Sequence, residues 1–297
     1  MRLADRQDGV VSRRQLHALG VTRWRIRAQV AAGRWRAVHR QTIAVHTGPL
    51  GPAARHWHAV FEAGSRGVLD GASALVAAGL KGFSPRMIRV SVPRGAKVLR
   101  APGADVRQTR RLRPSDIEEG GIPRVRPDIA AVRAALWART DREAALVIAM
   151  TVQQRIVRAE QIGLALLDVR RDRRRKFVER VVLDVMGGSQ SLGELDVARE
   201  CRRRGIPEPD RQVVVRAANG TYFLDARWSA FGVVLEVDGL QHAQAAQLVG
   251  DALRHNDIAA TGDIVLRLPL LGLRVAPDQF FDQIRNALVQ RGWSAAA

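Results

Sequence analysis

The sequence has one cysteine, no long apolar run and no apolar leader, and each absence excludes a class of protein. Cys201 is the only cysteine among 297 residues, which excludes an intrachain disulfide and a zinc site built from several cysteines. No uncharged apolar stretch reaches the roughly 20 residues that a membrane-spanning helix needs. Residues 1–6 lack the apolar core of a signal peptide. We therefore expect a cytoplasmic protein with no membrane partner.

Acidic residues are scarce in the first part of the chain, where arginine is abundant. Residues 1–180 contain 36 Lys and Arg against 15 Asp and Glu, a net charge of +21. Residues 181–297 contain 12 against 14, a net charge of −2, and the whole chain carries +19. The preference for arginine over lysine also suits a GC-rich genome, which raises arginine without regard to function. The excess nevertheless predicts a polyanionic partner for the first part of the chain.

Residues 12–32 have the pattern of two short helices joined by a tight turn. Ser12, with Gln15 three residues later, predicts a capping box at the start of the first helix. Gly20 ends this helix, because glycine tolerates the positive φ of a helix C-terminus. Thr22 then caps a second helix, which Gly33 ends. The sequence therefore predicts a helix-turn-helix.

A basic hairpin is expected to follow the second helix and to act as a wing. Its strands are residues 34–40 and 43–45, joined by a polar turn at Gln41-Thr42. Residues 1–48 carry ten arginines against two aspartates, a net charge of +8. In a helix-turn-helix the second helix meets base edges, while flanking basic residues hold phosphates. The predicted DNA-binding residues are Ser12, Arg13, Arg14, Thr22, Arg23, Trp24, Arg25, Arg27, Arg34, Arg36 and Arg40.

A simpler alternative is that these arginines only solvate a small helical domain. The order of two capped helices, a glycine turn and a basic hairpin favours DNA binding over that alternative. Trp24 has two readings, contact with a thymine methyl group or closure of the core against the wing.

The rest of the chain predicts two further domains, a mixed middle domain at 49–186 and a C-terminal domain at 187–297, after the first at 1–48. The boundary near residue 48 is a turn-rich Gly-Pro segment. Middle-domain helices are expected at 55–63, 72–78, 128–138, 142–154 and 159–170, and strands at 86–92 and 104–109. The C-terminal domain has the order α-β-β-β-α-β, with strands at 211–216, 221–227, 233–238 and 264–268. The fold class is therefore α+β.

Acidic residues lie inside apolar strands of the C-terminal domain. Asp225 and Glu236 each interrupt an apolar run, which is costly unless the carboxylate is paired or binds a metal. Asp238 lies two residues after Glu236 and so faces the same side of the strand, and Glu194 could approach from the preceding helix. Hard oxygen ligands of this kind suit Mg²⁺. Asp225 and Glu236 are the candidate metal ligands.

Such a cluster could activate water for phosphodiester hydrolysis, with His242 as a nearby proton carrier. The alternative is that the carboxylates pair with Arg227 or Arg254 and that the domain is a scaffold without activity. We favour the scaffold. The candidate residues of a nuclease site are Glu194, Asp225, Glu236, Asp238, His242 and Arg254.

Several short segments of residues 1–150 together form a family-like pattern. They are Gly9-Val10-Val11-Ser12-Arg13-Arg14-Gln15-Leu16, Leu19-Gly20-Val21-Thr22, Gly33-Arg34, Val90-Ser91-Val92-Pro93, Val106-Arg107 and, more faintly, residues 122–134. Through these segments, residues 1–150 resemble the AbiEi-type antitoxins of type IV toxin–antitoxin systems. The resemblance implies a DNA-binding repressor that controls its own operon and neutralises a nucleotidyltransferase-like toxin encoded beside it.

Residues 190–290 are similar to domains related to the very-short-patch-repair endonuclease, in the PD-(D/E)xK superfamily. The sharpest match is Glu-x-Asp-Gly-x-x-His, which runs from Glu236 to His242. The resemblance implies a nuclease fold that need not be active. The catalytic lysine of the superfamily, expected two residues after Glu236, is here Asp238, although related nucleases dispense with it. The further matching positions are Asp225, Asp251, Arg254, Gly262 and Val265-Leu266-Arg267.

The sequence thus favours a DNA-binding transcription regulator of antitoxin type, whose partners are duplex DNA and a nucleotidyltransferase-like toxin. The first alternative is a Mg²⁺-dependent DNA endonuclease that the winged helix targets to its substrate. A further alternative is an adaptor whose middle region grips a toxin. The leading hypothesis requires no enzyme activity and no cofactor.

Overall fold

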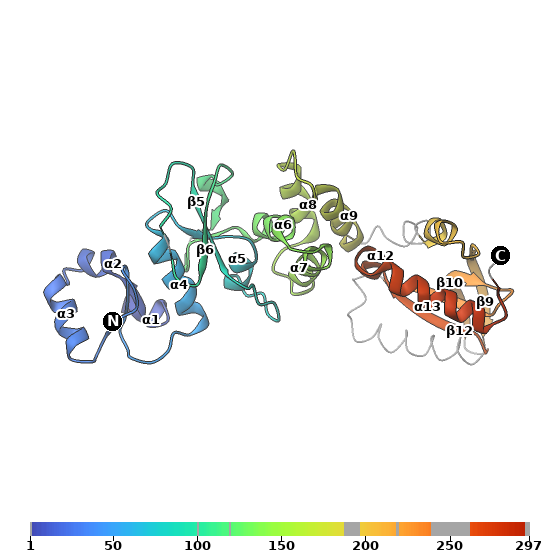
Figure 1. Cartoon of the computed structure of the whole chain (residues 1–297), viewed down its shortest axis with the longest axis horizontal. Coiled ribbons are helices and arrows are strands. Elements are labelled where there is room, and N and C mark those ends of the chain that lie inside the picture. The colour runs from blue at the N-terminus through green and yellow to red at the C-terminus, as the bar shows by residue number, and fades with distance from the viewer. Residues whose placement is uncertain are drawn as a thin grey trace. The chain divides into compact units, whose positions relative to one another are not determined.

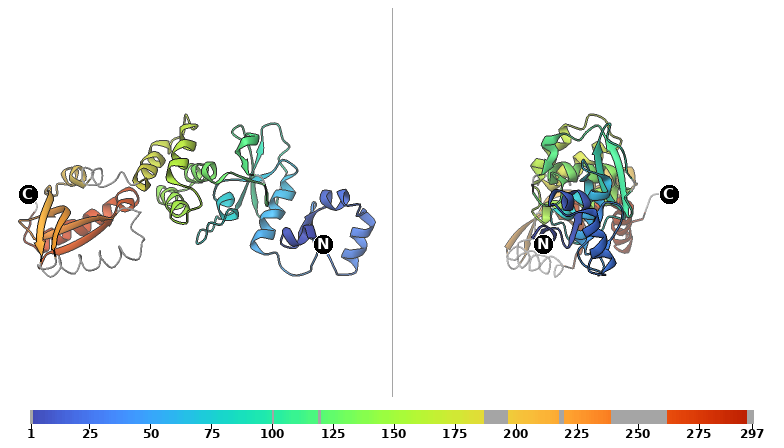
Figure 2. Two further views of the ribbon diagram at one scale, coloured as in Figure 1. Left: turned by 180° about the vertical axis from the view of Figure 1, so that it is seen from behind. Right: turned by 90° about the vertical axis from the view of Figure 1, so that its left-hand side faces the viewer.

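The computed structural model describes residues 2–99, 101–118, 120–186, 197–217, 220–238 and 262–294. Among these residues the strands form three sheets and helices accompany them, so the architecture is α+β, as predicted. The chain divides into two compact units, Met1–Trp137 with Gln154–Val157, and Ala138–Gln153 with Arg158–Ala297. Each unit is described by itself, and Figures 1 and 2 follow the elements along the chain. The predicted division into three domains stays a prediction.

The N-terminal module, residues 2–48, opens the first unit. Its three-stranded sheet has the order β1-β3-β2 and is antiparallel throughout. Its buried core consists of Ala4, Val11, Leu16, Ile26 and Ile43. The elements are α1 (Arg2–Arg6), β1 (Val10–Ser12), α2 (Arg13–Ala18), α3 (Arg23–Ala31), β2 (Arg36–Ala37) and β3 (Thr42–Ala44).

Two features of this module differ from the sequence prediction. β1 was not predicted, because a three-residue strand is recognisable only through its pairing with β3, 32 residues further on, where Val11 is opposite Ile43. The hairpin strands are also shorter than expected. Thr42 was assigned to the turn, but it is the first residue of β3 and is fully buried. The hairpin turn therefore covers residues 38–41.

A second sheet of five short strands forms the rest of the first unit, in the order β6-β5-β4-β8-β7. The predicted strands at 86–92 and 104–109 are confirmed as β5 and β6, which pair in parallel. The two-residue strands β4, β7 and β8 are too short to give a sequence signal. The elements are α4 (Pro52–Ala63), β4 (Val68–Leu69), α5 (Gly71–Ala77), β5 (Ile88–Pro93), β6 (Ala104–Thr109), a 3-10 turn (Pro114–Asp116), β7 (Ile117–Glu118), β8 (Arg124–Val125) and α6 (Pro127–Trp137).

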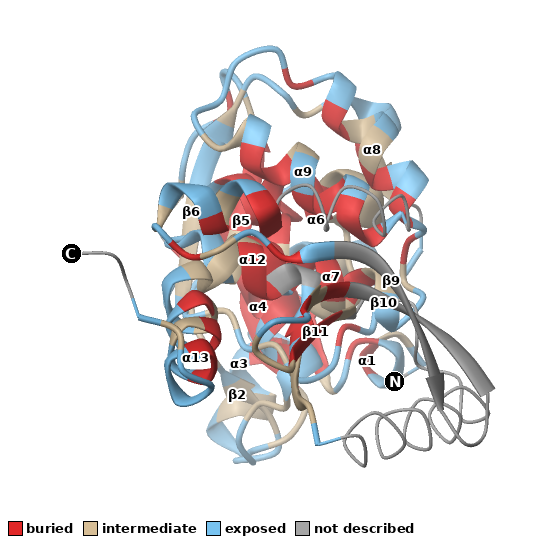
Figure 3. Cartoon of the chain, turned by 90° about the vertical axis from the view of Figure 1, so that its right-hand side faces the viewer, coloured by how far each residue is buried: buried red, intermediate tan, exposed pale blue. Residues whose placement is uncertain are grey.

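A buried ion-pair network joins α6 to the N-terminus of α5. Arg133 is 7 % exposed on α6, a helix that is buried over most of its length (Figure 3). Its Nη1 lies 2.9 Å from Oδ2 of Asp70, which is fully buried, and its Nη2 lies 3.3 Å from Oδ2 of Asp116. Asp70 also accepts the backbone N–H of Gly71 and so caps α5. The two carboxylates and one guanidinium thus satisfy one another away from water.

The second unit combines helices with a four-stranded sheet of order β12-β11-β10-β9. β9, β10 and β11 are antiparallel neighbours, and β12 runs parallel to β11. All four predicted strands are present, and the predicted helix at 243–260 lies outside the described residues. The elements are α7 (Asp141–Gln153), α8 (Ala159–Leu167), α9 (Arg175–Val185), β9 (Asp210–Ala217), β10 (Gly220–Trp228), β11 (Val233–Asp238), β12 (Ile264–Pro269), α12 (Leu270–Val275) and α13 (Pro277–Gln290).

The core of this unit explains why its cysteine is inert. Cys201 lies in a helical segment, residues 197–203, and is fully buried among apolar side chains that include Phe281 and Leu288 of α13. Burial raises the pKa of the Cys201 thiol to about 12, and the carboxylate of Glu208 adds to that effect. The thiol is therefore a packing group and not a nucleophile. Among the described helices, none has the length and apolar character required to cross a bilayer.

Candidate nucleic-acid interface

The first turn of α2 is fixed by the predicted capping box. Ser12 Oγ accepts the backbone N–H of Gln15 at 3.1 Å, and Gln15 Oε1 accepts the backbone N–H of Ser12 at 2.9 Å. Gly20, with φ of +76°, ends the turn after α2 in the left-handed region. Since Ser12 is 8 % exposed and its hydroxyl is engaged in the cap, its side chain serves the helix rather than an external ligand.

Capping contacts stabilise both ends of α3. The helix itself buries very little of its surface. Thr22 Oγ1 accepts the backbone N–H of Arg25 at 3.3 Å, as predicted, and Gly33 follows the helix with φ of +64°. Of its nine residues only Ile26 is buried, and Val30 packs partly against the same core. The remaining surface of α3 faces solvent.

An exposed tryptophan on α3 has two guanidinium groups close to its ring. Trp24 is 63 % exposed, and the guanidinium carbons of Arg23 and Arg27 each lie 5.1 Å from its ring centroid. Trp24 therefore does not close the core against the hairpin; Trp35 packs against that core instead. An exposed aromatic ring beside two cations is suited to bind a nucleic acid, because the ring can stack on a base and the cations can contact phosphates.

The other predicted DNA-binding arginines lie on α2, on α3, after α3 and along the hairpin. Arg14, Arg25, Arg34 and Arg40 are exposed, and Arg13 and Arg36 are partly buried. Several hold the local backbone or a neighbour through one nitrogen, which leaves other N–H groups for a ligand. These bonds are Arg13 Nε to the carbonyl of Arg40 at 2.9 Å, Arg34 Nε to Gln29 Oε1 at 2.7 Å, and Arg36 Nη2 to the carbonyl of Gly48 at 2.8 Å.

Positive charge on this face is not neutralised by its own chain. No acidic side chain that the structure describes forms an ion pair with Arg23, Arg25 or Arg27. Asp8, one of the two acidic residues of the module, uses Oδ2 to accept the backbone N–H of Ala54 at 3.0 Å. That carboxylate thus stabilises the N-terminus of α4 instead of pairing with an arginine of α3.

The other end of α4 holds the hairpin turn through Glu62, a residue that the sequence analysis did not single out. Its carboxylate is 3 % exposed and accepts four hydrogen bonds. The donors are His39 Nδ1 at 2.8 Å, the backbone N–H of Gln41 at 2.8 Å, the backbone N–H of Thr42 at 2.9 Å and the hydroxyl of Thr42 at 2.8 Å. Asp8 and Glu62 together tie the module to α4, at its start and at its end.

The protonation states around Glu62 follow from this geometry. Burial acts to raise the pKa of Glu62, but hydrogen bonds from His39, Thr42 and Gln41 outweigh it and hold the pKa below its usual value. His58 Nδ1 lies 3.0 Å from Thr42 Oγ1. Because the single hydroxyl proton of Thr42 goes to Glu62, His58 is the donor in that contact. Burial lowers the pKa of His58, although Glu62 opposes the shift.

His56 and His58 are packing residues of α4. Both are buried on α4, and burial lowers the pKa of His56 with a smaller contribution from Arg55. The spacing of His58 and Glu62, four residues apart on one helix, was the sequence signal that could have revealed the Glu62 contacts.

The candidate nuclease residues are only partly visible. Glu236 is 6 % exposed on β11, and its Oε2 lies 3.6 Å from Nε of Arg267 on β12. β10 pairs Ala226 with Leu235 in antiparallel register, and continuing that register by one residue sets Asp225 opposite Glu236. The side chains of Asp225 and Asp238, and all of Glu194, His242 and Arg254, lie outside the described residues.

Two described guanidiniums of this sheet lie beside carboxylates. Nη2 of Arg227, one of the two arginines predicted to pair with the strand carboxylates, lies 2.9 Å from Asp263 Oδ2, and Arg267 lies beside Glu236. Within the described ranges no three His, Cys, Asp or Glu side chains converge as a metal site. Of the candidate carboxylates, only the side chain of Glu236 is among those described, with the guanidinium of Arg267 beside it, and no hydrolytic step is derived from that pair.

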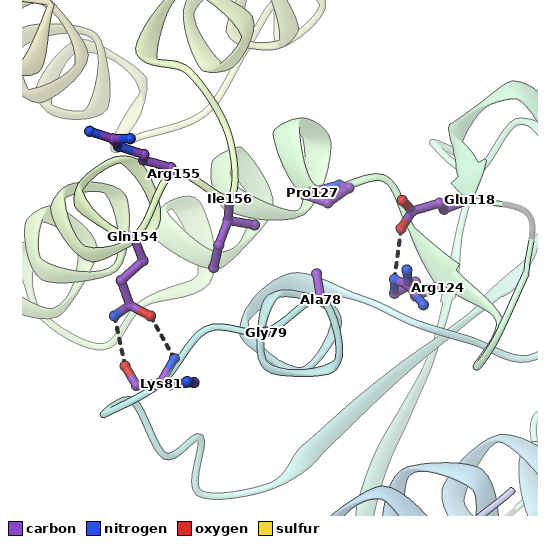
Figure 4. A pocket seen from close by; sticks show the side chains of 9 residues that line it. All are labelled: Ala78, Gly79, Lys81, Glu118, Arg124, Pro127, Gln154, Arg155 and Ile156. Atoms are coloured by element: carbon purple, nitrogen blue, oxygen red, sulfur yellow. Dashed lines mark hydrogen bonds and ion pairs between the residues drawn. The ribbon is translucent and has the colours of Figure 1, made fainter. Parts of the chain in front are cut away.

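A cavity of about 730 Å³ lies at the C-terminal end of α5 and is lined by nine residues, which Figure 4 shows. Its polar groups are largely used in pairs. The side-chain amide of Gln154 bonds both backbone groups of Lys81, at 2.8 and 2.9 Å, and Arg124 Nε lies 2.7 Å from Glu118 Oε2. Among the described residues that line this cavity, none is a nucleophile with an adjacent base.

The chain matches no family model and no curated protein. Among solved structures the chain is similar to the RV2827C protein from Mycobacterium tuberculosis, with a TM-score of 0.40 and 18% sequence identity, over 65% of this chain and 77% of that chain. A similarity this weak does not establish a shared fold or function.

Proposed function

We propose that the chain is a cytoplasmic DNA-binding transcription regulator of antitoxin type, and that its N-terminal module is a winged helix-turn-helix. The element order α1-β1-α2-α3-β2-β3 and the sheet order β1-β3-β2 are those of a winged helix. In this arrangement α3 enters the major groove, α2 crosses the phosphate backbone, and the turn of the β2–β3 hairpin is the wing.

The exposure of α3 is the observation that carries this proposal. A nine-residue helix that buries a single side chain gains little from packing, yet both of its ends are fixed by caps and glycines. Its solvent face presents Arg23, Trp24, Arg25 and Arg27 with no described acidic partner. Such a surface is suited to a polyanion, and Arg25, in the first turn of the helix, is placed to donate to a guanine edge.

Binding to duplex DNA by the full chain tests the proposal. Fluorescence anisotropy with the duplex upstream of the chain's own reading frame should give a preferred site. Arg25→Ala should lower affinity for that site by about 1–3 kcal/mol and lower discrimination between sequences. Arg86→Ala, which removes an exposed arginine outside the module, is the matched control and should bind as the parent does. Equal loss on every sequence would mean that Arg25 holds only phosphates.

The antitoxin part of the proposal is supported by the resemblance of residues 1–150 to AbiEi-type antitoxins. It implies a nucleotidyltransferase-like toxin as partner. Co-expression with such a toxin encoded beside the gene should restore growth, and the neutralised cells should contain both chains. Continued growth arrest with the full chain present at equal abundance would remove the antitoxin part and leave DNA binding untouched.

A second candidate function is Mg²⁺-dependent DNA cleavage, which is favoured by the register that sets Asp225 opposite the buried Glu236. The guanidinium of Arg267 beside Glu236 argues for a scaffold instead. Incubation with plasmid and Mg²⁺ or Mn²⁺ separates the two, with Asp225→Ala and Glu236→Ala as controls. We expect no nicking; nicking by the parent chain that both substitutions abolish would replace the regulator with an endonuclease.

A further inference from the structure

A groove of about 940 Å³ lies beside the N-terminal module, within the first unit. One wall is formed by α2, through Ser12, Arg14, Gln15 and Ala18, and by Gln41 of the hairpin turn. The opposite wall comes from α4 and from the segments around β4 and β7. Its size is that of a pocket for a small organic molecule, which typically occupies about 300–1,000 Å³.

The floor of the groove is apolar and its rim is cationic. The apolar lining residues include Trp57, Val60, Phe61, Val68, Leu99 and Leu112. The charged residues in the described lining are Arg14, Arg66 and Arg113, all exposed, and the lining residues that the structure describes include no aspartate or glutamate. An occupant with an apolar body would cover the floor, and an anionic head would meet the three guanidiniums.

We propose that this groove binds an apolar organic molecule with one anionic head group, and that its occupancy weakens DNA binding. The second half rests on the proposed function. Arg14 lies on α2, the helix expected to cross the phosphate backbone, and the same side chain lines the groove. A guanidinium that holds the head group of a ligand is no longer available to a phosphate, so the ligand and DNA compete for Arg14.

The adjoining hairpin turn gives the groove a second connection to the interface. Gln41 lines the groove, and its backbone N–H donates to Glu62. A second cavity, of about 750 Å³, shares Gln41 and Leu99 and reaches His39, Arg40 and Glu62. A ligand in the groove therefore contacts the same turn that would follow the DNA minor groove or backbone as the wing.

A matched pair of dyes tests the binding site without DNA. 8-Anilinonaphthalene-1-sulfonate and N-phenyl-1-naphthylamine have the same ring system, but only the first carries an anionic group. We expect the full chain to bind the sulfonate about tenfold more tightly, as measured by fluorescence titration. Arg66→Ala with Arg113→Ala, which leaves only Arg14 of the three guanidiniums, should reduce that preference several-fold and leave binding of the neutral dye unchanged. Ser65→Trp, which fills the groove from an exposed lining position, should weaken both dyes.

The control is Arg86→Ala with Arg139→Ala, which removes two exposed arginines that do not line the groove and should keep the preference. Equal binding of the two dyes by the parent chain, or an unchanged preference in the Arg66→Ala, Arg113→Ala variant, would overturn the site. An apolar protein segment as the true occupant would show the first pattern, because a groove for such a segment needs no anionic head group.

Duplex binding measured with and without the dye distinguishes failure of the groove from failure of the proposed function. At fixed salt, saturating 8-anilinonaphthalene-1-sulfonate should weaken duplex binding by the parent chain several-fold and have a smaller effect on Arg14→Ala. DNA affinity that is indifferent to the dye would overturn the competition. If the chain binds the dye as described but no duplex, the proposed function fails and the groove stands. If it binds duplex and neither dye, the groove fails alone.

Discussion

Arg133 on α6 and Arg25 on α3 have the same side chain in opposite surroundings. Arg133 is 7 % exposed and bonds two carboxylates, whereas Arg25 is exposed on a helix that buries one residue. The first guanidinium can be removed only at the cost of leaving Asp70 charged and buried. The second makes no described ion pair, so its loss should leave the fold intact.

The difference teaches that the charge of this chain has two roles that composition alone does not separate. The large basic excess of residues 1–180 includes buried arginines that stabilise the fold and exposed arginines that are available to bind a partner. Burial and acidic neighbours distinguish the two groups. Substitutions of buried residues should therefore lower stability, and substitutions on α3 should lower DNA affinity without lowering stability. A substitution that changed both properties together would contradict the comparison.

Arg133→Ala should have the largest effect, on stability. Removing one partner of a buried ion pair typically costs about 3–5 kcal/mol, because the remaining charge is left without compensation. Here the remaining group is Asp70, which is fully buried. Urea unfolding of the full chain should show the loss. The exposed-arginine control Arg86→Ala should stay within about 0.5 kcal/mol of the parent; a loss of that small size for Arg133→Ala would contradict the structural role.

Glu62→Gln should have the next largest effect, and it should depend on pH. The folded state holds the pKa of Glu62 below its usual value of 4.5, so the carboxylate contributes stability that is present above that pH and is lost as the pH falls through the lower, folded value. We expect a loss of about 2 kcal/mol at pH 7, the size of charged hydrogen bonds.

Unfolding of parent and variant at several pH values measures this dependence. The difference between them should shrink as the pH falls below 4.5. Glu160→Gln, at an exposed position in the first turn of α8, is the control and should show little difference at any of these pH values. A difference for Glu62→Gln that is the same at pH 7 and pH 3 would show that shape, and not charge, holds the hairpin turn.

Trp24→Ala should have the smallest effect on stability, within about 0.5 kcal/mol, since Trp24 is 63 % exposed. It should still weaken duplex binding, by about 1 kcal/mol if the ring stacks on or contacts bases. Trp35→Ala in the same module is the contrast, because Trp35 packs against the core and its loss should lower stability measurably. Equal stability losses for the two tryptophans would contradict the placement of α3.

Local signals in the sequence predicted the elements that local chemistry forms. Ser12, Gln15 and Thr22 cap helices through atoms within three residues, and Gly20 and Gly33 supply positive φ where the helices end. Such signals involve residues that are close together in the sequence, so they can be recognised without knowledge of the fold. β1 was missed because its pairing partner is distant, and the two-residue strands β4, β7 and β8 were missed because no periodicity exists over two positions.

Long-range contacts explain what the sequence did not reveal at the candidate site. Glu62 was not identified, because all four of its hydrogen bonds come from His39, Gln41 and Thr42, which lie 20 to 23 residues earlier in the chain. Glu236, by contrast, was flagged because an acid inside an apolar strand is unusual, but its neighbour Arg267 depended on the strand order. Sequence finds an unusual residue more easily than it finds that residue's partner.

The salt dependence of duplex binding by the full chain tests the central claim, that α3 is a DNA-binding helix, most directly. The logarithm of the binding constant should fall linearly with the logarithm of salt concentration, by about 0.9 for each phosphate neutralised. In the Arg23→Ala, Arg25→Ala, Arg27→Ala variant that slope should be shallower by about one for each arginine that contacts a phosphate, with the unfolding free energy unchanged. A steep slope that is identical in the parent and the folded variant would contradict the account.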